Sequence, residues 1–183
     1  ISNQEDIFGN VAEIISVSYE LVKTTPAVPF DIAINEFMYD PATGYSEFIE
    51  LNSHTGKTIN LKGWTISDNT GNHQLISNEN FYVQRYPDQI SPVGPKQYVI
   101  LSSDSTINVS DNIRLVLGSR FPTLNNTTDA IILKNAEGVT IDSLTYSSSW
   151  GGNEVSLERK SVTVSGIYQA NWEDSPSTNF GTP

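Results

Sequence analysis

The chain of 183 residues has no cysteine and only 10 basic residues against 21 acidic ones. Without cysteine, a thiol nucleophile, a thiolate zinc site and a disulfide framework are all excluded. The formal net charge of -11 repels phosphate backbones and anionic lipid headgroups. We therefore expect no nucleic-acid partner and no membrane insertion. The charge itself is most simply explained by solubility.

Long apolar runs are also missing. No stretch approaches the roughly 18 apolar residues that a membrane-spanning helix needs. The sequence begins at Ile1 with no basic-then-apolar leader. We expect it to be a piece excised from a longer protein, whose targeting information lies elsewhere. Its length fits one large domain, or a domain of about 150 residues with a fragment of a neighbour.

Helical periodicity is scarce, and short β-branched and aromatic stretches recur between Asn, Gly, Pro, Asp and Ser clusters. Phe30, Ile32 and Ile34 fall on one face of the first predicted strand. Gly138 sits in a short loop typical of a β-hairpin. The pattern predicts an all-β sandwich or barrel, with at most single helical turns near 105–111 and Arg120. The predicted strands are 30–36, 98–101, 113–117, 130–133 and 139–144.

The first 25 residues differ from the rest. Residues 6–10 predict a tight turn before a strand-like segment over 11–22. Residues 26–29 form a stiff, extended linker, because each proline disfavours helical conformation in its predecessor. Two interpretations stand side by side: 1–25 are the terminal hairpin of a preceding immunoglobulin-like domain, or they add an edge strand to the main domain over 30–183.

No local motif predicts catalysis. His54 and His73 lie in polar loops, and no nucleophile elbow, zinc-binding histidine pair or phosphate loop occurs. The only carboxylate cluster resembling a glycosidase pair is Glu36, Asp40, Glu47 and Glu50.

Strand alternation places Glu47 and Glu50 on opposite faces, which argues against such a pair. Hydrogen bonding within the fold is the favoured role for Glu36 and Glu50. A hydrolase that uses Glu36 and Asp40 stays an alternative.

A weak calcium site is conceivable at Asp68, Thr70 and Asn72, where oxygen ligands alternate around a glycine. The same pattern occurs in turns in which Asp and Asn cap their own backbone. The favoured interpretation is therefore a turn without a cofactor.

Aromatic residues offer a sugar-stacking platform as a further hypothesis. Trp64 begins an alternating segment after Gly63, which favours burial in the core. Trp150 and Trp172 lie in loop-like sequence, where they either are exposed to a ligand or pin a loop to the domain.

Several short sequence motifs follow one another in a fixed order, and together they run from about residue 30 to the end, about five-sixths of the chain. They are INEFMYDP (34–41), EFIEL (47–51), LKGWTISD (61–68), LNN (124–126), DAIIL (129–133), DSLTY (142–146), SLER (156–159), NW (171–172) and GTP (181–183). This ordered set resembles bacterial lamin-tail domains.

The resemblance implies an immunoglobulin-like β-sandwich without a catalytic motif, so no active-site residue is carried over. Bacterial copies typically sit in large secreted or surface proteins beside other β domains, nucleases or hydrolases. In nuclear lamins the domain contacts chromatin. The sequence of this chain shows no basic patch that would support such a contact. Structural roles are expected for five residues: Glu36, Glu50, Gly63, Trp64 and Trp172. In SLER, we expect Leu157 to point inward and the adjacent Glu158 and Arg159 to form an opposite-charge pair at the end of the strand, worth at most about 1 kcal/mol if it is exposed.

Between His73 and Gly94 the chain is longer than the family pattern, with an aromatic insertion at 81–86. An extra edge strand is the simpler interpretation. The candidate ligand contacts are Tyr82, Arg85, Tyr86 and Trp150.

The sequence therefore predicts a non-catalytic interaction or spacer module of an extracellular or cell-surface protein. Its expected partners are neighbouring domains of the same polypeptide, and protein or polysaccharide at the cell surface. A carbohydrate- or calcium-binding accessory domain attached to a hydrolase or nuclease is the alternative.

Overall fold

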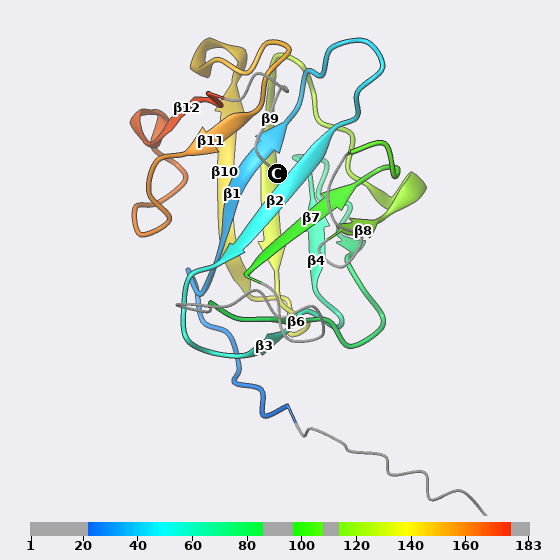
Figure 1. The fold of residues 1–183 in the computed structure, drawn as a ribbon, viewed down its shortest axis with the longest axis vertical. Coiled ribbons are helices and arrows are strands. Elements are labelled where there is room, and N and C mark those ends of the chain that lie inside the picture. The colour runs from blue at the N-terminus through cyan, green and yellow to red at the C-terminus, as the bar shows by residue number, and fades with distance from the viewer. Residues whose placement is uncertain (1–21, 86–96, 108–113, 177–183) are drawn as a thin grey trace, which may run out of the picture.

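The computed structural model describes residues 22–85, 97–107 and 114–176 (Figure 1). These residues form β-strands and three single-turn 3-10 helices but no α-helix. Within them, no helix has the length and apolar character that crossing a membrane requires. The strands are β1 (Ile32–Met38), β2 (Phe48–Ser53), β3 (Ile59–Asn60), β4 (Thr65–Ser67), β5 (Gln74–Leu75), β6 (Tyr82–Val83), β7 (Tyr98–Ser102), β8 (Arg114–Val116), β9 (Thr128–Lys134), β10 (Thr140–Ser147), β11 (Leu157–Arg159) and β12 (Trp172–Asp174); the helical turns are η1 (Gly118–Arg120), η2 (Ser148–Trp150) and η3 (Gln169–Asn171).

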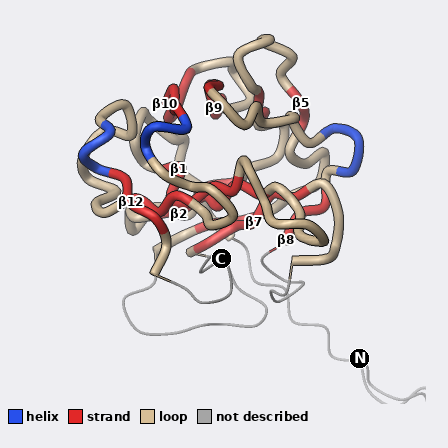
Figure 2. Tube along the Cα trace, turned by 90° about the horizontal axis from the view of Figure 1, so that it is seen from above, coloured by secondary structure: helices blue, strands red, loops and turns tan. Residues whose placement is uncertain are grey.

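Two sheets face each other (Figure 2). The larger has the order β12-β11-β1-β2-β7-β8, and the smaller has the order β10-β9-β4-β5. A short pair, β3-β6, lies at one end of the sandwich (Figure 1). Neighbouring strands are antiparallel except for β7 and β8. The all-β sandwich predicted from the sequence is confirmed.

The predicted hairpin is formed by β9 and β10. Its turn requires a left-handed residue, and Gly138 takes a φ of 80° there. The side chain of Asn135 holds the turn, since its Oδ1 accepts hydrogen bonds from the backbone N–H groups of Glu137 and Val139. A local sequence signal therefore sufficed for this element. The expected helical turn around Arg120 is η1; residues 108–111 of the other expected turn lie outside the described residues.

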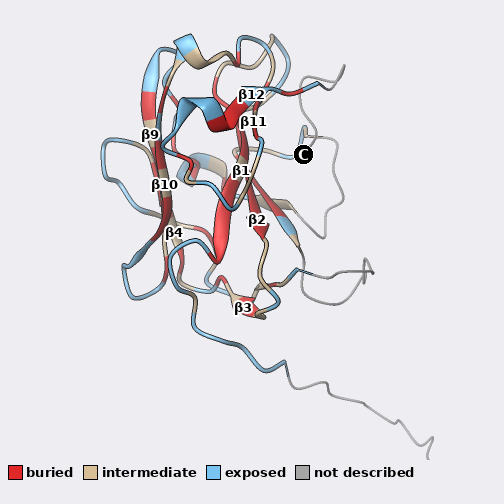
Figure 3. Cartoon of the chain, turned by 90° about the vertical axis from the view of Figure 1, so that its left-hand side faces the viewer, coloured by how far each residue is buried: buried red, intermediate tan, exposed pale blue. Residues whose placement is uncertain are grey.

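The core fills the space between the two sheets, and buried residues concentrate on the strands (Figure 3). On β1, a bulge between Ile34 and Glu36 shifts the alternation, so that Phe37 continues the inward face. Phe37 contacts Tyr146 of the smaller sheet and Trp172 of β12, with ring centroids 5.0 and 5.1 Å apart. These aromatic contacts join both sheets across the core.

Phe30 departs from the prediction, because it does not lie in a strand. The chain turns at Pro29, where the Asp31 N–H donates to the Val28 carbonyl at 3.1 Å, and β1 begins only at Ile32. Phe30 has a φ of 70°, and 47% of its surface is exposed. Strand periodicity alone could not detect this turn.

The outer face of the larger sheet carries a second apolar cluster. Met38, Phe48 and Ile100 are buried there and pack with the partly buried Ile107. They alternate along their strands with residues of the main core, such as Phe37 and Ile49. Both faces of this sheet are therefore buried around the β1–β2–β7 region.

Candidate functional site

Four glutamates lie side by side across the larger sheet. The strand register places Glu36 of β1 between Glu50 of β2 and Glu158 of β11, and Glu158 opposite Glu173 of β12. Directly opposed residues in antiparallel strands have Cβ atoms about 4.5–5.5 Å apart. Glu36 and Glu50 are buried, Glu158 is half-buried and Glu173 is exposed. We call these four residues the carboxylate row.

Burial governs the chemistry of the row. It raises the pKa of Glu50 to about 8; the hydrogen bond from Asn35 Nδ2 at 2.7 Å opposes the rise, and the charges of Glu36 and Glu158 add to it. Glu36 accepts a hydrogen bond from Ser156 Oγ at 2.5 Å, which ties β1 to the residue preceding β11. A general acid must reach the reacting atom, and Glu50 is only 4% exposed. The geometry therefore suits a protonated, structural carboxyl.

The other two acidic candidates lie elsewhere. Glu47 accepts a hydrogen bond from the Leu124 N–H at 3.3 Å. Burial raises its pKa to about 7; that hydrogen bond lowers it, and Asp129 raises it. Asp40 accepts a hydrogen bond from Asn126 Nδ2. Both carboxylates thus hold the 121–127 segment between β8 and β9, and the structure does not join them with the carboxylate row.

A buried ion pair links the two sheets. Arg159 Nη1 on β11 lies 2.6 Å from Asp142 Oδ2 on β10, and both side chains are almost completely buried. Asp142 also accepts the Ile34 N–H at 2.9 Å, and Arg159 donates to the Ile34 carbonyl and to the Val164 carbonyl. The ion pair of Arg159 is therefore with Asp142 in the core, whereas the sequence suggested the adjacent Glu158. Asp142 lies 17 residues away in sequence, so no local pattern could indicate the pair.

The two histidines occupy different environments. His54 follows β2 and is half-buried; burial lowers its pKa, and the charge of Arg159 lowers it further. His73 is exposed beside β5, with its Nε2 2.9 Å from Lys134 Nζ. The contact of His73 with Lys134 is not a base–nucleophile pair.

The candidate calcium residues form a tight turn. Asp68 Oδ1 accepts hydrogen bonds from the Thr70 N–H at 2.8 Å and from Thr70 Oγ1 at 2.5 Å, and the Asn72 N–H lies 3.4 Å from Thr70 Oγ1. This is the self-capping arrangement typical of Asp-containing turns. The described ranges contain no group of three or more His, Asp or Glu side chains placed to hold a metal ion.

The residues expected to be structural are buried or tightly packed. Trp64 is 3% exposed, and Trp172 is 4% exposed with its indole N–H donating to the Gly166 carbonyl at 2.8 Å. Gly63 has a φ of 79°, and a Cβ there would lie 3.1 Å from the Cβ of Ala136. Glycine is therefore required both for the conformation and for the close approach.

The candidate ligand contacts do not form one surface. Tyr82 is half-buried on β6, which pairs with β3, and Arg85 is exposed with its N–H donating to the Thr55 carbonyl at 3.0 Å. Trp150 belongs to η2 and packs, partly buried, against the core. Because η2 follows the last residue of β10, it lies at the end of the sandwich opposite to β3 and β6 (Figure 1). Tyr86 lies outside the described residues.

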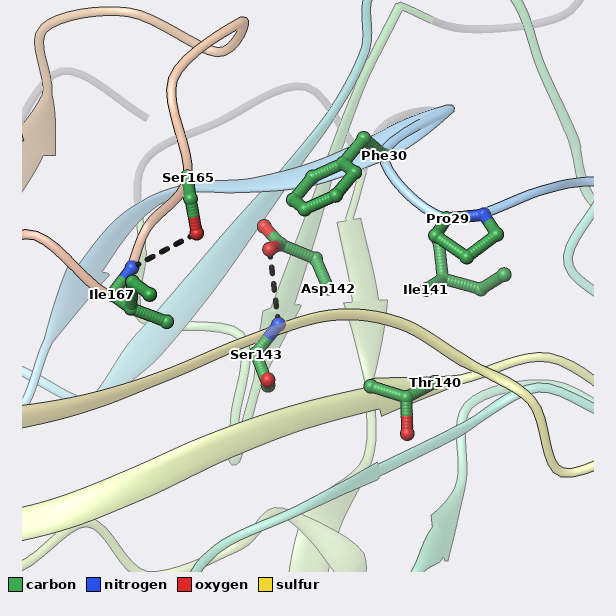
Figure 4. A pocket seen from close by; sticks show the side chains of 8 residues that line it. All are labelled: Pro29, Phe30, Thr140, Ile141, Asp142, Ser143, Ser165 and Ile167. Atoms are coloured by element: carbon green, nitrogen blue, oxygen red, sulfur yellow. Dashed lines mark hydrogen bonds between the residues drawn. The ribbon is translucent and has the colours of Figure 1, made fainter.

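Two hollows open on the surface. The first, of about 160 Å³, lies between β10 and the loop after β11 (Figure 4). The second, of about 420 Å³, lies between the segment preceding β1 and the β9–β10 turn. The first is lined by Pro29, Phe30, Thr140, Ile141, Asp142, Ser143, Ser165 and Ile167, and the second by Thr24, Thr25, Pro26, Ala27, Ile59, Asn60, Lys62, Trp64, Asn135, Ala136 and Glu137.

Two open sheets of short strands around one core define an immunoglobulin-like β-sandwich. A sequence model of one family of such domains, the Lamin Tail Domain, matches residues 25–148. The chain belongs to this family, which is a non-catalytic one. The match ends at 148, so β11 and β12, with Arg159 and Trp172, complete the larger sheet from outside the matched segment. No curated protein shows a significant match to the chain.

Proposed function

We propose that the chain is a non-catalytic interaction and spacer module of a larger secreted or cell-surface bacterial protein. The observation that carries the proposal is that several acidic side chains of the chain are buried and bonded within the fold. Glu36 and Glu50 are buried in the carboxylate row, and Asp142 is paired with Arg159 between the sheets. These carboxyl groups are hydrogen-bonded or ion-paired within the sandwich, which suits a domain that works through its surface.

The segment before β1 supports the spacer role. Val22 to Val28 has no regular secondary structure, and its residues are largely exposed (Figure 3). Pro26 and Pro29 restrict its backbone. The Thr25 N–H donates to the Thr58 carbonyl at 2.8 Å, which anchors the segment to the end of the sandwich where β3 lies. A neighbouring domain attached through this segment would be held away from the sandwich.

The test is a substrate panel of glycosides, phosphodiesters, esters and peptides, assayed with the wild-type chain and with Glu50→Gln. We expect no turnover above background for either protein. Turnover by the wild type that falls about tenfold or more in Glu50→Gln would overturn the proposal, because it would make the carboxylate row catalytic.

A carbohydrate-binding accessory domain is the second candidate, and the 420 Å³ hollow favours it. Its volume lies in the usual range for small-molecule sites. Asn60, Lys62 and Glu137 supply polar and charged groups to its lining. A glycan array with the wild type and Lys62→Ala tests this candidate: a glycan whose binding is lost in the variant would support it, and binding unaffected by the variant would contradict it. Calcium titration by calorimetry tests the weak site at Asp68 in the same way, with Asp68→Asn as the variant.

A further inference from the structure

In the part of the chain that the structure describes, the edge of the smaller sheet at β10 has no strand beside it. Within the described part of the chain, β10 pairs only with β9, although it is the longest strand, with eight residues. A free edge displays unpaired N–H and C=O groups and accepts another strand. Two devices that block such an edge, a bulge and the inward-pointing charge of Asp142, lie at the start of β10, and the rest of the strand contains neither lysine nor proline.

The register identifies which backbone groups point outward. The Ser148 N–H donates to the Thr127 carbonyl at 2.7 Å, which extends the β9–β10 ladder by one hydrogen-bonded pair. Hydrogen-bonded positions alternate in an antiparallel pair. The backbone N–H and C=O groups of Leu144 and Tyr146 therefore point toward β9, whereas those of Thr145 and Ser147 point away from it. No backbone hydrogen bond from another described segment reaches Thr145 or Ser147.

The first outward position of this edge is already used by the turn at 28–31. The Phe30 N–H donates to the Ile141 carbonyl at 2.9 Å. Beyond Phe30 the edge runs along the loop that follows β11, and Gln169 Nε2 of that loop lies 3.4 Å from the Ser149 carbonyl. The 160 Å³ hollow lies between this loop and the end of the edge near Phe30 (Figure 4).

Apolar side chains stand exposed at the hollow and on the loop beside it. Ile167 and Tyr168 are 56% and 58% exposed, and Phe30 is 47% exposed. Phe30 also has a left-handed backbone, a conformation that is unfavourable for a bulky residue. Strained, exposed aromatic residues of this kind are concentrated where a side chain is held for a ligand. The volume of the hollow is that of one large aliphatic side chain.

Charge decides which occupant fits. Among the described residues that line the hollow, the only charged side chain is Asp142, and Arg159 neutralises it at 2.6 Å. The hollow is thus locally uncharged on a chain whose net charge is -11. A second copy of the chain would bring another charge of -11 to the same place, which opposes self-association. The fitting occupant is an extended, non-acidic segment of a different polypeptide.

We propose that the free edge of β10 binds an extended, non-acidic peptide segment of another protein or domain. Its backbone pairs with Thr145 and Ser147, and one large apolar side chain enters the hollow between Phe30 and Ile167. This is strand addition, in which main-chain hydrogen bonds provide affinity and a side-chain pocket provides specificity. The inference rests on the proposed interaction function and names the surface and the class of partner.

The probe is a phage-displayed library of random peptides of roughly a dozen residues, selected on the complete 183-residue chain. Affinities of the selected peptides are measured by fluorescence anisotropy. Thr145→Pro removes one outward N–H, and edge strands tolerate proline at such positions. Thr145→Val keeps the N–H and is the matched control. Phe30→Asn removes the ring but keeps a residue that accepts the left-handed backbone.

We expect the selection to yield non-acidic peptides that contain a large apolar residue. Their Kd should rise about tenfold or more in Thr145→Pro and in Phe30→Asn, but less than about threefold in Thr145→Val. Absence of any peptide with a Kd below about 1 mM, or equal binding to Thr145→Pro, would overturn the proposal. A dimer in ultracentrifugation that Thr145→Pro dissolves would overturn the chosen occupant in favour of a second copy.

Amide hydrogen exchange keeps the proposal testable if Thr145→Pro does not fold. Saturating peptide should slow exchange at Thr145 and Ser147 of the wild-type chain, and unchanged exchange at both would refute strand addition. If strand addition is refuted, the proposed function still stands, and the module would bind its partner through another face. Failure of the proposed function would instead appear as carboxylate-dependent turnover in the substrate panel.

Discussion

Replacing Glu50 by glutamine should stabilise the sandwich at neutral and alkaline pH. Burial raises the pKa of this carboxyl from 4.5 to about 8, so the folded protein holds the proton more tightly than the unfolded chain does. Stability from this group is fully present below pH 4.5, falls as the pH rises, and is lost once the pH passes 8. One pKa unit corresponds to about 1.36 kcal/mol, so the loss between pH 4.5 and pH 7 is about 3 kcal/mol.

Glutamine is neutral at every pH and can still accept the hydrogen bond from Asn35 Nδ2. We therefore expect equal stability of Glu50→Gln and wild type near pH 4.5, and a variant more stable by about 3 kcal/mol at pH 7. Urea denaturation followed by tryptophan fluorescence, repeated from pH 4.5 to pH 8.5, measures the difference. Glu137→Gln, on the exposed β9–β10 turn, is the matched control. Parallel pH profiles for Glu50→Gln and wild type would refute the reasoning.

Three further substitutions test the core by denaturant unfolding. Arg159→Leu should cost about 3–5 kcal/mol because Asp142 stays buried without its cation; adding Asp142→Asn should recover part of this loss, and additive losses would contradict the coupling. Trp172→Ala should cost about 3–5 kcal/mol for its buried ring, and a change under about 0.5 kcal/mol would show that the ring is dispensable. Gly152→Ala should cost more than about 1 kcal/mol, since its φ is 83° and a Cβ would lie 2.5 Å from the Tyr39 ring; an unchanged denaturation midpoint would contradict this.

The carboxylate row and the Asp142–Arg159 pair show how the described part of this acidic chain accommodates carboxyl groups inside its fold. Like charges in register are unfavourable, and in the row this is relieved by protonation of Glu50. The opposite charges of Asp142 and Arg159 cancel inside the core. The buried polar groups of the fold therefore work in its assembly.

Local pattern was enough to predict several of the strands, the β9–β10 hairpin and the family. Alternation reports the two faces of a strand because side chains repeat every second residue, and a turn such as that at Gly138 requires only adjacent residues. The burial of Trp64 follows from the same kind of signal. These features depend on neighbours in the sequence, so the sequence was sufficient for them.

Only the tertiary structure decided which strands become neighbours and in what register. The bulge after Ile34 places Glu36 beside both Glu50 and Glu158, and β10 meets β11 across the core so that Asp142 reaches Arg159. The exposed edge of β10 likewise depends on the order of strands in the sheet. Period-two alternation specifies a face but not the strand that lies next to it, because pairing between distant segments is set by packing of the whole core.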